Sequence, residues 1–257
     1  MRRINKGHEE YVRIVDSGDK AVFMVHGIVS TPRHFDFLIP LIPKEWSVCN
    51  ILLDGHGGSV RDFSASSMKI WKKNVRNRLD SLCKKHSTVI VVAHSMGTLL
   101  AMEQLCDFPQ IKAMVLINPP LCARVMPVMI PYSLKFCFGM VDRNNPVQAA
   151  LYDDIGIKLS RYLWEYLGWI PRFLELLKLC RESRETAKTI KIPCHVFLSG
   201  RDELVSMNTY KHIKDNPNIK VFICGRSGHS YYKPGFIKNV KQSFIGLIDK
   251  FNVENKV

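Results

Sequence analysis

The stretch VVAHSMGTLLA, residues 91–101, holds a single serine between an apolar run and a helical pattern. A serine hydroxyl at such a bend becomes a nucleophile when a neighbouring base removes its proton. Small residues at Ala93 and Gly97 would let the strand and the helix approach closely and turn the hydroxyl of Ser95 outward. A serine in front of a helix is also a common N-cap. These residues alone therefore leave two interpretations open, a nucleophile and a capping residue.

The elements that would position Ser95 follow from the hydrophobic pattern. Six short apolar segments end in polar or glycine residues, as buried strands do, at residues 20–27, 46–57, 87–95, 111–120, 192–202 and 218–229. Helical periodicity lies between them, at residues 31–42, 64–86, 96–107 and 235–251. This alternation predicts an α/β fold with a mostly parallel, doubly wound sheet and helices on both faces. Residues 9–18 could add an antiparallel strand at the start.

Polar residues end each of the six predicted strands. The carboxyl ends of parallel strands share one edge of the sheet, where ligands bind in open α/β folds. We expect the following residues at that edge: His26, Gly27, residues 54–57, Ser95, Asn118, Asp202 and His229. A nucleophile, an acid and a base then meet in the chain order Ser95, Asp202, His229. This convergence favours the nucleophile over the cap.

Five motifs between residues 26 and 230 carry a family resemblance: HGIVSTP, LLDGHGGSVRDF, AHSMG, SGRDELV and GRSGHS. On these motifs the chain resembles the α/β-hydrolase family of serine esterases and lipases, and it looks closest to the bacterial monoacylglycerol lipase and small carboxylesterase branch. The turn around the serine usually reads G-x-S-x-G. Ala93 replaces the first glycine here, a form that also occurs in some bacterial lipases of this fold. The resemblance implies an α/β-hydrolase fold and carboxylic ester hydrolysis.

The roles of the site residues follow from the chemistry and from this resemblance. Ser95 needs an imidazole base, and that base needs an orienting carboxylate. His229 and Asp202 fit these two roles, and Asp202 stands where the family's GRD motif places the acid. Glu203 is the alternative acid. Three further histidines near the edge, His26, His56 and His94, are expected to shape loops rather than to act as bases.

An oxyanion formed during acyl transfer needs preorganised N–H donors. Met96, directly after the serine, would supply one backbone N–H. Ile28 would supply the second, because the preceding Gly27 gives the chain the backbone freedom to turn.

About seventy residues separate two predicted strands where a crossover needs about a dozen. We expect residues 121–190 to form a helical lid, and residues 1–120 and 191–257 to form the α/β-hydrolase core. The segment is rich in methionine and aromatic residues: Met126, Met129, Phe136, Phe138, Met140, Tyr162, Trp164, Tyr166, Trp169 and Phe173. Many of these side chains would simply pack the lid onto the core. A lid of this composition would also cover an apolar pocket suited to an acyl chain.

Composition limits which other kinds of site and which locations are expected for this protein. The eight cysteines occur singly, without a C-x-x-C pair, and we expect them to be reduced core residues. No histidine or cysteine spacing fits a metal site, so neither a metal nor a cofactor is expected. The start of the chain has no apolar stretch of a secretory signal, and prolines interrupt the apolar region 113–141, so we expect a soluble cytoplasmic protein.

The formal net charge of +14 could indicate affinity for nucleic acid or anionic lipid. The basic residues are spread along the chain and no nucleic-acid-binding motif accompanies them, so we expect no nucleic-acid partner and, at most, peripheral contact with lipid surfaces. The oligomeric state stays open.

The sequence therefore predicts a serine hydrolase that cleaves esters of lipophilic acyl chains, with monoacylglycerols as the leading substrate. The same three residues could instead serve a thioesterase, a carbon–carbon bond hydrolase or an acyltransferase. A non-catalytic small-molecule receptor on this fold is a further alternative.

Overall fold

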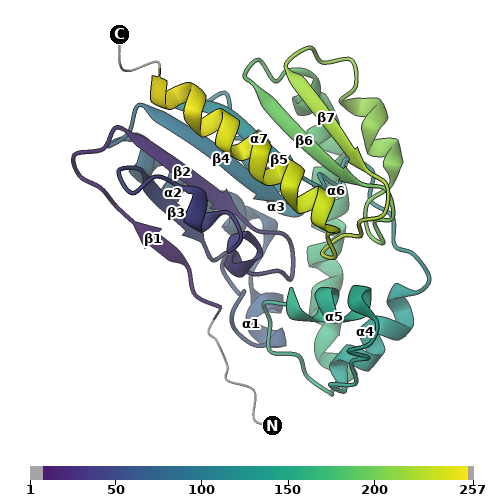
Figure 1. Cartoon of the computed structure of the whole chain (residues 1–257). Coiled ribbons are helices and arrows are strands. Elements are labelled where there is room, and N and C mark those ends of the chain that lie inside the picture. The colour runs from purple at the N-terminus through teal and green to yellow at the C-terminus, as the bar shows by residue number, and fades with distance from the viewer. Residues whose placement is uncertain (1–7, 254–257) are drawn as a thin grey trace.

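The computed structural model describes residues 8–253, and its strands form one seven-stranded sheet in the order β1-β3-β2-β4-β5-β6-β7 (Figure 1). The strands are β1 (Tyr11–Arg13), β2 (Lys20–Val25), β3 (Ser47–Ile51), β4 (Thr88–His94), β5 (Ile111–Ile117), β6 (Cys194–Ser199) and β7 (Ile219–Cys224). β1 pairs antiparallel with β3, and every other pair is parallel. The predicted α/β fold and the antiparallel first strand are confirmed. Residues 1–7, which contain the first basic residues of the chain, lie outside the residues that the structure describes.

Helices cover both faces of this sheet. The helices of the described residues are α1 (Val60–Ala65), α2 (Met68–Cys83), α3 (Met96–Met102), α4 (Met129–Cys137), α5 (Pro146–Asp153), α6 (Trp169–Lys188) and α7 (Pro234–Val253), with the 3-10 helices η1 (Pro32–Phe35), η2 (Ile39–Leu41), η3 (Leu163–Gly168) and η4 (Met207–His212). Figure 1 shows α7 lying across one face, with α2, α3 and α6 behind the sheet. β4 lies between β2 and β5, so the residue that follows it sits near the middle of the sheet edge.

The helix predicted over residues 31–42 is wrong, because two short 3-10 helices, η1 and η2, occupy this region. Pro40 has no N–H to donate, so a continuous α-helix over these residues would lose the hydrogen bond from residue 40 to the Asp36 carbonyl, and the proline ring would clash with that carbonyl. The apolar spacing in this stretch is still meaningful, since Phe35 and Leu38 are buried against the sheet.

Two other helices are shorter than predicted. The pattern over 64–86 belongs to two helices, because the chain is extended at Ser66 and Ser67 between them. The hydroxyl of Ser67 accepts the Ile70 N–H at 3.3 Å and so begins α2 as its N-cap. The helix predicted over 96–107 ends at Met102, and turns follow it.

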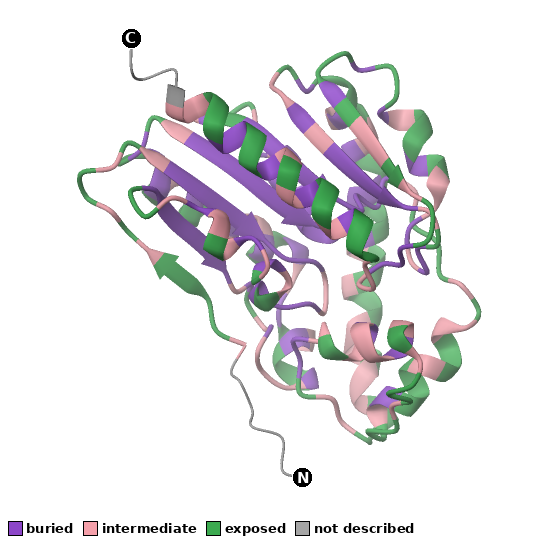
Figure 2. Cartoon of the chain, viewed as in Figure 1, coloured by how far each residue is buried: buried purple, intermediate pink, exposed green. Residues whose placement is uncertain are grey.

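Two apolar layers hold the helices to the sheet. Successive strand residues point to opposite faces, so Phe23 packs in the layer that contains Trp71 of α2, and Val22 packs in the layer that contains Phe244 of α7. Figure 2 shows the central strands almost entirely buried, whereas α7 is exposed along its outer face. Burial on this scale fixes the strand ends, and therefore the site, to a rigid base.

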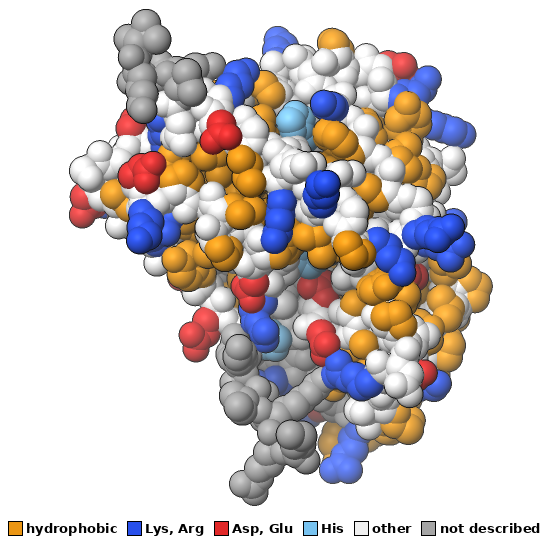
Figure 3. Space-filling model, in the orientation of Figure 1, with side chains coloured by type: hydrophobic (Ala, Val, Ile, Leu, Met, Phe, Trp, Pro, Cys, Tyr) orange, Lys and Arg blue, Asp and Glu red, His pale blue; other side chains and the backbone are white. Residues whose placement is uncertain are grey.

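The chain between β5 and β6 contains α4, α5, η3 and α6. The inner side of α6 is part of the core, because Leu176, Leu179 and Cys180 pack in the same layer as α2 and α3. The outer parts leave many large apolar side chains exposed: Val125, Ile130, Leu134, Phe138, Met140, Tyr162, Leu163, Trp164, Leu167, Ile170, Phe173, Leu174 and Leu177. Figure 3 shows hydrophobic side chains gathered at the lower right, where Figure 1 places α4 and α5.

All eight cysteines are free thiols. Cys49, Cys83, Cys180 and Cys194 are buried, but Cys106 is exposed, so the expectation that the cysteines are core residues holds only in part. Among the described helices, none combines the length and the apolar composition needed to cross a membrane.

Candidate active site

Ser95 lies at a strained bend between β4 and α3. Its backbone has φ 50° and ψ −126°, a conformation that non-glycine residues rarely adopt. The Ser95 hydroxyl makes no cap hydrogen bond to α3, although the residue occupies the N-cap position. A Cβ atom on Gly97 would lie 2.2 Å from the carbonyl oxygen of Val25, so only glycine fits where the helix crosses the neighbouring strand. The bend thus leaves the hydroxyl free to bond elsewhere, which excludes the capping interpretation.

The structure brings Ser95, His229 and Asp202 into one hydrogen-bonded chain. Nε2 of His229 lies 3.0 Å from Oγ of Ser95, and Nδ1 lies 2.9 Å from Oδ2 and 3.0 Å from Oδ1 of Asp202. All three side chains are buried. With Nδ1 protonated and donating to the carboxylate, Nε2 is free to accept the serine proton, which is the arrangement that activates a serine nucleophile.

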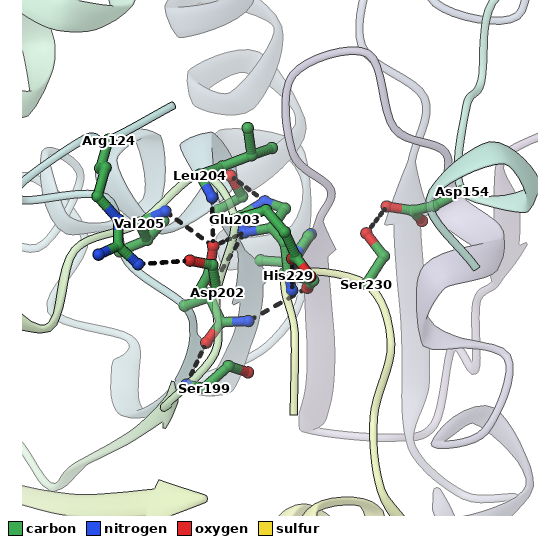
Figure 4. Close-up of polar contacts among 12 residues, drawn as sticks. Arg124, Asp154, Ser199, Asp202, Glu203, Leu204, Val205, His229 and Ser230 are labelled. Carbon is green, nitrogen blue, oxygen red and sulfur yellow. Dashed lines mark hydrogen bonds and ion pairs between the residues drawn. The ribbon is translucent and has the colours of Figure 1, made fainter. Parts of the chain in front are cut away.

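Backbone donors fix the carboxylate of Asp202 (Figure 4). Its Oδ1 accepts the N–H groups of Leu204 at 2.8 Å and Val205 at 2.7 Å. The guanidinium of Arg124 donates to the backbone carbonyl of Asp202 at 2.9 Å. The two bonds to Oδ1 hold the carboxylate in the orientation in which it contacts His229, and the Arg124 bond holds the backbone of the same residue. No motif in the sequence singled out Arg124, because its contact is with backbone.

Glu203 performs a different task from that of Asp202. Its Oε2 accepts the backbone N–H of His229 at 2.8 Å, and a Cβ atom on Gly228 would lie 2.7 Å from Oε1. Glu203 therefore holds the loop that carries the histidine, while Asp202 holds the ring. Of the two candidate acids, Asp202 has the geometry of an orienting carboxylate.

Two further side chains hold the carbonyl group of His229. Asn118, at the end of β5 with φ 49°, donates from Nδ2 to this oxygen at 3.2 Å, and its Oδ1 accepts the Ser199 N–H at 2.8 Å. Nε2 of His94 donates to the same oxygen at 3.2 Å. Both the N–H and the C=O of His229 are thus bonded to side chains, so its ring is positioned from several strands at once.

The surroundings of His229 shift its affinity for a proton. Burial lowers the pKa of the imidazole, but the negative charge and the hydrogen bonds of Asp202, with smaller contributions from Asp154 and Glu203, outweigh burial and raise the pKa above its usual 6.5. The protonated ring is therefore stabilised. This property suits a base that holds a proton while charge develops on the substrate.

The two predicted oxyanion donors belong to segments next to Ser95: Met96 follows it in the chain, and a Cβ atom on Gly27, the residue before Ile28, would lie 2.9 Å from the Ser95 Cβ. Met96 begins α3, where backbone N–H groups lack partners within the helix. Ile28 follows Gly27 in the turn after β2, and among the described residues no acceptor binds its N–H. The next residue, Val29, has φ 62°, which is unusual for a β-branched side chain. The turn is thus strained in a way that leaves the Ile28 N–H unused.

His26 and His56 hold loop backbone, as expected of loop-shaping residues. Nδ1 of His26 donates to the Gly27 carbonyl at 2.8 Å, and Nε2 accepts the Leu53 N–H at 3.1 Å. His56 accepts the Val29 N–H at 3.1 Å and so stabilises the strained turn. Burial lowers the pKa of His26 well below its usual value and that of His56 to about 4, so both rings are neutral.

A cavity of about 590 Å³ opens beside His229 and Ile28. Its wall is mostly apolar and comes largely from the segment between β5 and β6: Val125, Met129, Leu134, Phe136, Leu151, Ile155, Leu159, Leu163, Tyr166, Trp169, Ile170 and Phe173. Half of the ten methionine and aromatic residues singled out in the sequence belong to this wall. Trp164 does not, and it is 65% exposed. The cavity has the volume and lining of a small-molecule site.

Sequence and structure comparisons agree with this architecture. The model of the alpha/beta hydrolase family matches residues 22–233, so the chain belongs to the α/β-hydrolase family. No curated protein shows significant sequence similarity to the chain.

Three solved structures illustrate the shared fold. One is a structure of the metagenome-derived lipolytic enzymes LipS and LipT, 16% identical, covering 95% of this chain and 98% of its own, with a TM-score of 0.72. The second is a monoacylglycerol lipase from Paleococcus ferrophilus, 14% identical, covering 93% and 98%, with a TM-score of 0.65. The third is a deformylase from Pseudomonas putida, 15% identical, covering 90% and 95%, with a TM-score of 0.55.

Proposed function

We propose that the protein is a carboxylic ester hydrolase that acts on lipophilic acyl esters, with monoacylglycerols as the leading substrate. The observation that carries this proposal is the hydrogen-bonded chain Ser95–His229–Asp202 beside an apolar cavity of about 590 Å³. The lipase and esterase functions of the similar structures agree with it.

In the first half of the reaction, Oγ of Ser95 attacks the ester carbonyl carbon while Nε2 of His229 takes its proton. The resulting oxyanion accepts hydrogen bonds from the N–H groups of Met96 and Ile28, each contributing about 3 kcal/mol to the lowering of the barrier. The protonated His229 then gives its proton to the alkoxide oxygen as the carbon–oxygen bond breaks. The alcohol leaves, and the acyl group stays on Ser95.

In the second half, a water molecule replaces the alcohol. His229 takes a proton from the water as it attacks the acyl carbonyl, and it returns that proton to Oγ of Ser95 when the acid leaves. Asp202 keeps the ring oriented and stabilises its positive charge throughout. The enzyme returns to its starting state with no cofactor consumed.

Residues 121–190 act in this proposal as a lid over the site, with residues 1–120 and 191–257 as the core. Several cavity residues, among them Leu134, Ile170 and Phe173, are also exposed, so the wall of the cavity continues onto an apolar outer surface. A lipophilic ester could enter there from a lipid surface, which supports peripheral contact with lipids. The free cysteines agree with a reducing compartment and support a cytoplasmic location.

A substrate panel tests the reaction class. The kcat/KM of the purified protein and of Ser95→Ala would be measured on matched oxygen esters, thioesters, formyl amides and a carbon–carbon-cleavable diketone of equal acyl length. We expect oxygen esters to give the highest kcat/KM and Ser95→Ala to lose this activity. A higher kcat/KM on any other class would overturn the ester assignment and would leave the nucleophile in place.

A further inference from the structure

Asp154, the residue directly after α5, points its carboxylate at three side chains of the core. Its Oδ1 accepts hydrogen bonds from the hydroxyl of Ser30 at 3.0 Å and from Nδ1 of His34 at 2.8 Å. Its Oδ2 accepts the hydroxyl of Ser230 at 2.8 Å, as Figure 4 shows. The carboxylate side chain is only 14% exposed. A residue of the segment between β5 and β6 thus makes three charge-assisted bonds to the core.

Two of these partners belong to the loops that form the candidate site. Ser230 directly follows His229, and Ser30 lies two residues after Ile28 in the strained turn. Asp154 therefore connects the loop that carries the proposed base to the turn that carries a proposed oxyanion donor. Among the described residues, no hydrogen bond joins the turn of Ile28 directly to the loop of His229.

The third partner, His34, extends the connection. Its Nε2 accepts the hydroxyl of Tyr232, three residues after His229, at 3.0 Å. Its ring stacks on His94 at 3.7 Å between centroids, and His94 in turn donates to the carbonyl of His229. A second route therefore runs from Asp154 to the backbone of the proposed base.

The backbone beyond Asp154 is also fastened to the core. The Gly156 N–H donates to the Val29 carbonyl at 2.7 Å, and the Gly156 carbonyl accepts the Gly57 N–H at 2.6 Å. The Lys158 N–H donates to the Gly58 carbonyl at 2.8 Å. Residues 154–158 are thus bonded to the core along their length.

Metal binding does not account for this cluster as well as hydrogen bonding does. The ligand atoms of His34, His94 and Asp154 lie within 4.8 Å of one another. Both nitrogens of His34 are already bonded, to Asp154 and to Tyr232, and Nε2 of His94 is bonded to a carbonyl. Nδ1 of His94 is buried without a hydrogen-bond partner among the described residues, but a metal ion shared with His34 would still have to break a bond of the His34 ring.

We propose that Asp154 is a positioning residue for ester hydrolysis, which holds the loop of His229 and the turn of Ile28 in their reactive arrangement. The inference rests on the proposed function. Because a displacement of about 1 Å at a reacting group can cost about a hundredfold in rate, three bonds that fix two loops are sufficient for a large effect.

The charge of Asp154 affects the pH dependence of the reaction, and a simple loss of structure would not change this pH dependence. The negative charges that act on His229 are the carboxylates of Asp202, Asp154 and Glu203, and burial keeps the neighbouring ring of His94 neutral by lowering its pKa. Asp154 is among the charges that raise the pKa of His229. Replacing it by asparagine keeps the shape but removes the charge, so the midpoint of the acid limb of the pH profile should move to lower pH.

The test compares Asp154→Asn with Asp153→Asn, which removes the same charge from the neighbouring residue, an exposed partner of Arg143. For each protein we would measure kcat and KM on a soluble short-chain ester, and the rate at which a fluorophosphonate labels Ser95. The kinetic constants and the labelling rate would each be measured as a function of pH. The melting temperature would be measured as the control for folding. We expect Asp154→Asn to lower kcat and the labelling rate by about tenfold or more, to change KM little, and to move the acid limb to lower pH. Asp153→Asn should match the original protein.

Two results with Asp154→Asn would overturn the inference: unchanged kcat and acid limb, or a lower melting temperature and lower kcat with an unchanged acid limb. If the variant does not fold, Ser230→Ala decides, since it removes one of the same bonds from the other side. A several-fold slower labelling of Ser95 in Ser230→Ala is expected, and an unchanged rate would overturn the inference. Absence of labelling in the original protein would overturn the proposed function as well.

Discussion

Glu203 binds the backbone of His229 rather than its ring: its Oε2 accepts the histidine N–H at 2.8 Å, while the ring Nδ1 lies 2.9 Å from Asp202. Two adjacent carboxylates therefore hold one histidine in different ways, since one bonds its backbone and the other bonds its ring. Substitutions of the two residues should therefore have distinguishable effects on catalysis.

Asp202→Asn should lower kcat on a soluble ester by about ten-thousandfold, because the amide cannot hold the ring tautomer that leaves Nε2 free. Glu203→Gln should cost at most about a hundredfold, because the amide oxygen can still accept the backbone N–H. Steady-state kinetics on both variants, with circular dichroism as a control for folding, measure the difference. A larger loss in Glu203→Gln than in Asp202→Asn would transfer the role of acid to Glu203.

The kcat/KM of ester hydrolysis should fall as the pH is lowered, with a midpoint above 6.5, because only neutral His229 can accept the serine proton and its pKa is raised. The contribution of His229 to folding stability changes with pH in the opposite direction to the rate. A raised pKa in the folded state stabilises the protein below the unfolded pKa, and this stability is lost as the pH rises through the folded pKa. Rate profiles and urea unfolding at several pH values measure the two trends. A rate midpoint below 6.5 would contradict the raised pKa of His229.

Gly97→Ala should destabilise the protein by at least about 2 kcal/mol, because the new Cβ would lie 2.2 Å from a backbone oxygen that cannot move freely. Gly246→Ala is the matched control. Gly246 lies within α7, and a methyl group added there would meet no other atom within 4 Å, so alanine should stabilise by up to about 1 kcal/mol through helix propensity. Urea unfolding of both variants measures the contrast, and equal stability would show that the bend at Ser95 is not tightly packed.

Met129→Ala should weaken the preference for longer acyl chains, because Met129 belongs to the cavity wall and each buried methylene contributes about 0.8 kcal/mol. Met140→Ala is the control, since Met140 comes from the same segment but is 57% exposed and lies outside the wall. The profile of kcat/KM against acyl length, measured on both variants, tests the position of the acyl site. An unchanged profile in Met129→Ala would place the acyl chain elsewhere.

The sheet and the bend at Ser95 could be predicted because they depend on local pattern, and the meeting of Ser95 with Asp202 and His229 could be predicted because parallel strands end at one edge of the sheet. Buried strands and the bend at Ser95 are visible in the sequence as short apolar runs and small residues. The helix predicted over 31–42 is wrong because Pro40 interrupts a pattern whose apolar spacing is otherwise helical.

The supports of the site could not be predicted in the same way. Asp154 meets Ser230 across 76 positions of the sequence, and Arg124 meets the Asp202 carbonyl across 78. Such contacts depend on how the segment between β5 and β6 packs on the core, which no local pattern encodes. Trp164 shows the same limit, because composition placed it with the cavity residues and packing left it exposed.

Every step of the proposed reaction depends on Ser95 being the nucleophile, activated by His229. Fluorophosphonate labelling of the intact protein, followed by peptide mass spectrometry, examines this assignment without assuming any substrate. We predict a single label on the peptide that contains Ser95, absent in Ser95→Ala and slowed by several powers of ten in His229→Ala, with both variants folded. A label that persists in Ser95→Ala, or one that forms at the original rate in His229→Ala, would contradict the assignment.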